Sequence, residues 1–164
     1  MGFSVGDKVV HPRFGAGSIT ALQNKKHAEG TTRYYVIDVP AQRLTVRVPV
    51  LTAAAAGLRY AMSRLGPARV LSILRGRAHP LPDNYQHRQE QTAARLRTGR
   101  VTQLVRVVRD LTHHSRRARL TNVDSNYLRQ GVELLAAEMA LVTGQTIPET
   151  TKIIESALAA KPAA

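Results

Sequence analysis

The hydrophobic positions follow two different periods along the chain. Over about the first fifty residues, apolar and β-branched side chains come in short runs separated by Gly, Pro or polar residues, as is typical of strands. Between Leu44 and Val48 the apolar residues alternate with Thr45 and Arg47, which therefore share the other face. Strands are predicted at 8–10, 18–22, 34–39 and 44–48. Several short strands in so few residues predict a small, strongly bent antiparallel barrel.

After about residue 60 the apolar side chains recur at the spacing of helices. Helices are predicted at about 67–75, 83–98, 101–111, 122–143 and 147–160. Asp83 is the expected cap of the second helix, whereas Thr121 and Thr146 each stand three positions before an acidic residue, the spacing of a capping box. In the third helix Arg109 falls off the apolar stripe. Short helices with brief loops predict a compact bundle.

The change of period also divides the chain into domains. We predict an α+β protein with a small β-barrel domain over residues 1–56 and a compact, all-α helical domain over residues 57–164. A chain of 164 residues is long enough for two small domains of this kind.

Positive charge is concentrated in the middle of the chain. The whole sequence has 24 Lys and Arg against 11 Asp and Glu, a formal net charge of +13. Residues 59–119 alone contain fourteen Arg and three acidic residues, while residues 120–164 carry a net charge of −2. Because a solvated surface usually mixes signs, this block favours a nucleic-acid partner over the alternative, a generic surface in an arginine-rich proteome. An anionic membrane is disfavoured, since the block lacks a Trp/Phe/Leu face.

Signals of catalysis or metal binding are weak. The Gly15–Gly17 segment is interpreted as a hairpin turn, because a strand and not a helix follows it. His113 and His114 are adjacent, so they point to different sides of a helix and are poorly placed to chelate one metal. There is no cysteine, no secretory signal and no apolar run of membrane-spanning length. We expect a non-catalytic, cytoplasmic protein without metal or cofactor.

The segment from Pro80 to Arg88 contains a candidate contact residue. Tyr85 lies in the first turn of a predicted helix, behind two prolines and among polar and basic neighbours. One interpretation is that Tyr85 staples the helix start onto the core. The other is an exposed aromatic side chain on the same side as Arg88, able to stack on or wedge between bases.

Four motifs in order along the chain resemble one bacterial family. They are Gly6–Pro12 with Gly15, Leu44–Val50, Asn84–Tyr85 and Val107–Leu111. Together they resemble the CarD/CdnL family of RNA polymerase-binding transcription regulators. The resemblance covers nearly the whole chain, with a similar length and the same change from strands to helices.

The resemblance implies a Tudor-like N-terminal barrel that docks on the β subunit of RNA polymerase, partly by edge-strand pairing. Arg47 matches an arginine that the family uses in this contact, and Lys25 stands at the position of another basic contact residue. Thr45 and Val46 belong to the same implied polymerase-binding set. A chain of this family is expected to act as a monomer, to associate with the nucleoid and to have no membrane partner.

For the helical domain, the resemblance implies binding to the minor groove of promoter DNA at the upstream edge of the transcription bubble, which stabilises the open complex. The implied DNA-binding residues are Asn84, Tyr85, Gln86, His87 and Arg88. Tyr85 stands where the family has a tryptophan, and Tyr has less stacking area. The other function to consider is a general DNA- or RNA-binding architectural protein, which needs no exposed strand carrying Thr45 and Arg47.

Overall fold

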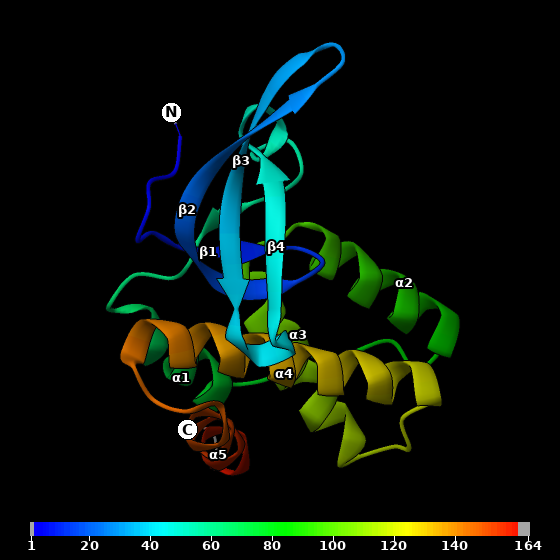
Figure 1. Cartoon of the computed structure of the whole chain (residues 1–164). Coiled ribbons are helices and arrows are strands. Elements are labelled where there is room, and N and C mark those ends of the chain that lie inside the picture. Colours follow the sequence, from blue (N-terminus) through cyan, green and yellow to red (C-terminus); the bar gives the residue numbers. More distant parts are fainter. Residues whose placement is uncertain (1, 161–164) are drawn as a thin grey trace. The chain divides into compact units, whose positions relative to one another are not determined.

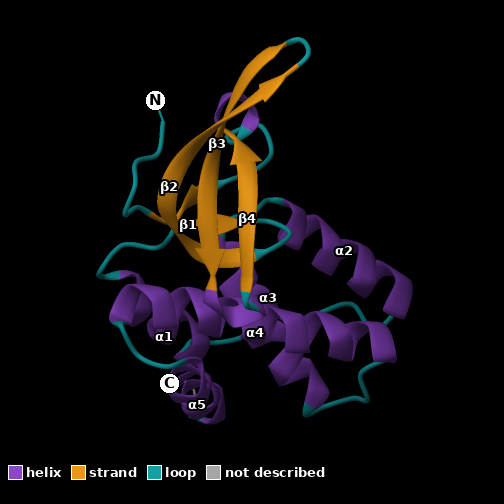
Figure 2. Cartoon of the chain, viewed as in Figure 1, coloured by secondary structure: helices purple, strands orange, loops and turns teal. Residues whose placement is uncertain are grey.

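The structure is a computed structural model that describes residues 2–160. It contains a strand-rich unit that ends at Ala61 and a helical unit that begins at Met62 (Figures 1 and 2). This organisation confirms the predicted α+β class. The division lies a few residues beyond the predicted end of the first domain at residue 56, because residues 59–60 form a strand that pairs with the first one.

The strand-rich unit is an open antiparallel sheet. Its strands are β1 (Lys8–His11), β2 (Gly15–His27), β3 (Gly30–Val39), β4 (Leu44–Pro49) and β5 (Arg59–Tyr60). They pair in the order β4-β3-β2-β1-β5, so β4 and β5 are the two edges. No pairing between the described residues joins these edges, and the predicted barrel is therefore barrel-like but not closed. Strand β5 was not predicted, because it is too short to show an alternating pattern.

Alternation along the strands builds the core of this unit. Every second residue of β3 from Tyr35 to Val39 is buried. The core consists of Val9, Ile19, Tyr35, Ile37, Val39, Val48, Ala53 and Leu58. Beyond the core, residues 24–33 of β2 and β3 pair only with each other and form a hairpin arm (Figure 2). The arm lacks an apolar face, so the pattern of hydrophobic residues did not reveal it.

The helical unit follows its predicted boundaries closely. Its helices are α1 (Gly66–Arg75), α2 (Tyr85–Arg97), α3 (Val101–Ser115), α4 (Asn122–Thr143) and α5 (Ile147–Ala159). The capping boxes at Thr121 and Thr146 are both present. One expected cap was wrong: Asn84, and not Asp83, caps α2, and its side-chain oxygen accepts a hydrogen bond from the His87 backbone N–H at 3.0 Å.

Helix α3 lies at the centre of the helical core. Apolar residues of α1, α3, α4 and α5 pack together there: Val70, Leu74, Leu104, Val105, Val108, Leu135, Ala136, Met139, Ile154 and Ala157. Although Arg109 falls off the apolar stripe, it is buried. Its Nε donates to Oδ1 of the buried Asp110 at 2.9 Å, and Arg95 Nη1 donates to Oδ2 of the same carboxylate at 2.9 Å. Part of the basic block is therefore used inside the protein.

Candidate functional site

The start of α2 presents an aromatic side chain to solvent. Pro80 and Pro82 restrict the chain before the helix, and Leu81 between them is buried and anchors it. Tyr85, the first residue of α2, is 52% exposed. This exposure matches the interpretation of Tyr85 as a contact residue and argues against the core interpretation. The amide nitrogen Nε2 of Gln86 lies 3.5 Å from the Tyr85 hydroxyl.

Arg88 is not on this exposed surface, contrary to the expectation from sequence. Its side chain is only 3% exposed. Nε and Nη2 donate to Oδ2 of Asp124 at 3.1 and 2.7 Å, while Nη1 donates to the carbonyl oxygens of Pro82 and Asp83, both at 3.1 Å. A guanidinium with these partners is not available to a DNA phosphate. Arg88 instead holds the segment before Tyr85.

Asp124 connects this segment to α4. It is the acidic residue of the α4 capping box, and its Oδ2 accepts hydrogen bonds from the Thr121 hydroxyl at 2.8 Å and the Thr121 backbone N–H at 3.1 Å. Gln89 of α2 in turn donates to Thr121 Oγ1 at 3.0 Å. Burial by itself would raise the pKa of Asp124, but hydrogen bonds from Arg88 and Thr121 outweigh burial and hold the pKa below its usual value. The carboxylate therefore stays charged and keeps the starts of α2 and α4 together.

The charged groups of this network also act on His114, near the end of α3. His114 is 4% exposed, and burial lowers its pKa, as do the positive charges of Arg88 and Arg117. Asp124 and Asp83 oppose this shift more weakly. The loop from α3 to α4 runs from this position back to Thr121.

That loop brings further positive charge towards the start of α2. Arg117 and Arg119 are exposed, and the guanidinium of neither has a hydrogen-bond or ion-pair partner among residues 2–160. Sequence reasoning located the basic block but did not single out these two arginines. A signal was present in the run Arg116–Arg119 between two helices. The loop that contains them ends at Thr121, which accepts a hydrogen bond from Gln89 of α2, the helix that begins at Tyr85. The remaining predicted DNA-contact residues are exposed: Asn84, Gln86 and His87.

The second candidate surface is the edge of the sheet at β4. Thr45 and Arg47 are exposed, whereas Val46 faces the core of the unit. Arg47 pairs in register with Val36, and Val36 pairs with Ala21 of β2. Since side chains alternate along a strand, Gln23 and Lys25 lie on the same face as Arg47.

A hydrogen bond confirms this placement, because Arg47 Nε donates to Gln23 Oε1 at 2.8 Å. Thr45 and Arg47 therefore share one face beside the β4 edge. Lys25 falls on the same face by alternation, but it lies in the hairpin arm beyond the end of β4. Val46 is half-buried against the core. Gln23 was not predicted as part of this surface.

Comparison with known proteins identifies the family. Residues 69–155 match the family described as "CarD, C-terminal domain", and residues 3–60 match the family described as "CarD-like/TRCF RID domain". The C-terminal match alone covers more than half of the chain. The chain belongs to the CarD family of transcription regulators.

A relative of this CarD-family protein is the Bacillus subtilis (strain 168) protein named "Putative transcription factor YdeB". It is 26% identical over 144 residues, which is 88% of this chain and 94% of that protein. The predicted resemblance is thus confirmed over both units. No helix within residues 2–160 is long and apolar enough to cross a membrane.

Proposed function

We propose that this CarD-family protein regulates transcription by binding the β subunit of RNA polymerase through the β4 edge and promoter DNA through the start of α2. It catalyses no reaction. The observation that best supports a DNA contact is the exposure of Tyr85 at the start of a helix that Arg88 and Asp124 hold in place. An aromatic side chain in a fixed position can wedge between partly unstacked base pairs.

The β4 edge fits a strand-addition contact with a protein. An edge strand offers unpaired backbone N–H and C=O groups to a partner strand. Arg47 beside this edge, and Lys25 in the adjoining hairpin arm, supply positive charge for an acidic patch on that partner, and such charges determine specificity and association rate. A purely nucleic-acid-binding protein does not require this combination of edge and charge.

The DNA contact at α2 is not sequence-specific in this proposal. Exposed arginines such as Arg117 and Arg119 bind phosphates, which position the protein without reading sequence. Tyr85 binds the melted or kinked junction at the upstream edge of the bubble better than closed duplex, so it shifts the equilibrium towards the open complex. A differential affinity of about 1–2 kcal/mol gives a shift of roughly 5- to 30-fold.

The test is the lifetime of open promoter complexes with Tyr85→Ala and Tyr85→Trp. Tyr85→Ala is expected to reduce the increase in lifetime that the protein produces by roughly 5- to 30-fold. This corresponds to a loss of about 1–2 kcal/mol, which lies within the range for base stacking on one aromatic ring. Tyr85→Trp is expected to lengthen it. Val123→Ala, which removes another exposed apolar side chain, serves as the control. Equal lifetimes with Tyr85→Ala and wild type, at unchanged stability, would contradict the wedge.

The alternative function is a general architectural protein that binds nucleic acid through its positive charge. The concentration of arginine in residues 59–119 favours it. The two functions differ in polymerase binding, which the architectural protein lacks. Recovery of the polymerase β subunit by wild-type protein, with loss of recovery for Arg47→Glu, separates them.

A further inference from the structure

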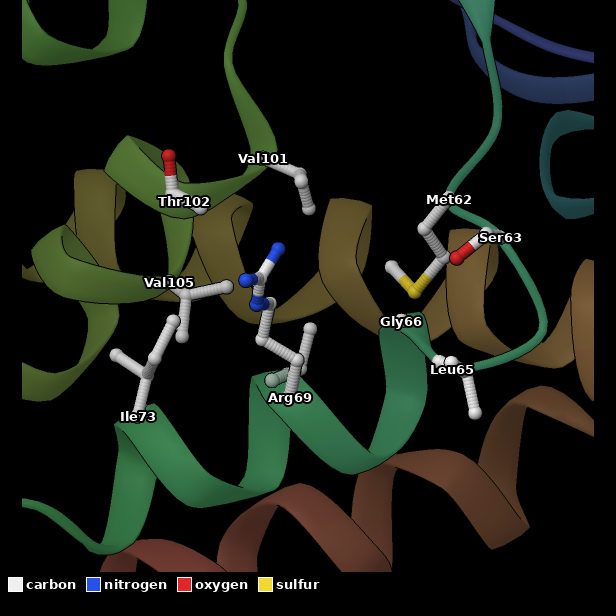
Figure 3. A pocket seen from close by; sticks show the side chains of 10 residues that line it. Met62, Ser63, Leu65, Gly66, Arg69, Ile73, Val101, Thr102 and Val105 are labelled. Carbon is white, nitrogen blue, oxygen red and sulfur yellow. The ribbon is translucent and has the colours of Figure 1, made fainter.

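The helical unit has a cavity that the proposed function does not use. It measures about 430 Å³ and is lined by Met62, Ser63 and Leu65 and by residues of α1 and α3 (Figure 3). Its apolar lining includes Met62, Val70, Ile73 and Val105. The volume falls within the range of about 300–1,000 Å³ that is common for small-molecule sites.

A single charged side chain lines this cavity. Arg69 extends from α1 into the space between Met62 and Val105 (Figure 3). Its guanidinium has no hydrogen-bond or ion-pair partner among residues 2–160. The cavity lining contains no acidic residue, and the carboxylate of Glu138 instead accepts a hydrogen bond from the Met62 backbone N–H at 2.9 Å. The cavity is therefore mainly apolar, with Ser63 and Thr102 in its lining and one unpaired cation on the exposed residue Arg69.

We propose that this cavity binds a small amphipathic anion, namely an aliphatic carboxylate of medium chain length. The carboxylate pairs with Arg69, because arginine presents N–H donors in the geometry of a carboxylate. The aliphatic chain lies against Val70, Ile73 and Val105. No aromatic side chain lines the cavity for stacking, which disfavours a nucleobase, and no carboxylate lines it to bind an amine.

Methionine methyl groups provide a direct measurement of binding. In full-length protein labelled with ¹³C at the methionine methyls, Met62 reports on the cavity, and Met139, which is 1% exposed in the core, serves as an internal comparison. Titration with octanoate below its micelle concentration is expected to shift the Met62 signal to saturation and to shift the Met139 signal less, because Met139 packs with Val70 and Val105 but does not line the cavity. Octanol and octyltrimethylammonium, which have the same chain without the negative charge, are expected to bind at least tenfold more weakly.

Two arginine variants test whether the positive charge of Arg69 binds the carboxylate. Arg69→Gln is expected to weaken octanoate binding about tenfold, the loss typical for one charge-assisted hydrogen bond. Arg75→Gln removes the same charge from an exposed position on α1 outside the cavity and is expected to have no effect. The proposal is overturned if octanoate gives no saturable shift, if octanol binds as tightly, or if both variants change binding equally.

Discussion

Arg88 and Asp124 form a buried ion pair that joins the first turn of α2 to the first turn of α4. The shortest contact, from Nη2 to Oδ2, is 2.7 Å, and the two side chains are 3% and 0% exposed. The two residues are 36 positions apart in sequence. Because Arg88 also binds the carbonyl oxygens of Pro82 and Asp83, the pair determines how the chain enters α2 and where Tyr85 projects.

Removing one partner of this pair is expected to destabilise the helical unit strongly. Asp124→Ala leaves the Arg88 charge buried without compensation, which costs about 3–5 kcal/mol in comparable cases. Urea unfolding of the full chain measures the change. Glu133→Ala, which breaks the exposed pair with Arg129, is the control and should change the free energy of unfolding little. Similar effects of the two substitutions would show that the buried pair has no special role.

The lowered pKa of His114 makes stability depend on pH. A histidine whose pKa is lower in the folded state than in the unfolded state binds more protons when unfolded, so its contribution is present above about pH 6.5, the unfolded value, and is lost as pH falls. The free energy of unfolding should therefore decrease between pH 7.5 and pH 5.

The variant His114→Gln should reduce that decrease. Urea unfolding at a series of pH values provides the measurement. A pH dependence that is identical in wild type and His114→Gln would contradict the assignment to His114.

Docking through the β4 edge predicts a large effect of charge reversal at Arg47. Arg47→Glu is expected to weaken binding to the polymerase β subunit by about 2 kcal/mol or more if the contact is a desolvated charge pair. The fold should be retained, since Arg47 is exposed and its hydrogen bond to Gln23 lies at the surface. Arg33→Glu makes the same change of charge on β3, where alternation places it on the opposite face of the sheet. Equal losses for the two variants would point to a general charge effect.

Phosphate contacts by the α3–α4 loop predict a particular salt dependence. The affinity of the full chain for duplex DNA should fall with salt, with a log–log slope of about −0.9 for each phosphate contact. Replacing Arg117 and Arg119 together by Ala should make the slope less steep by the contribution of about two phosphate contacts. The same double change at Arg75 and Arg77, which are also exposed, is the control. A slope that is unchanged by the first pair would remove this loop from the DNA surface.

The sequence by itself determined the features that depend on neighbouring residues. The capping boxes at Thr121 and Thr146 formed as predicted, because the side chain and the backbone groups that it satisfies are three residues apart. Alternation along 44–48 correctly put Thr45 and Arg47 on one exposed face. The exposure of Tyr85 also followed from a local pattern, since no apolar stripe around it required an aromatic side chain.

Only the tertiary structure decided which arginines are available to a partner. Arg88 and Arg109 look like other members of the basic block in sequence, yet both are buried beside carboxylates. The carboxylate that holds Arg88 lies in another helix, and whether a charge is buried depends on how helices pack and not on its neighbours in sequence. The grouping of Lys25 with Arg47 likewise depended on the register of three strands, which turns and packing determine together.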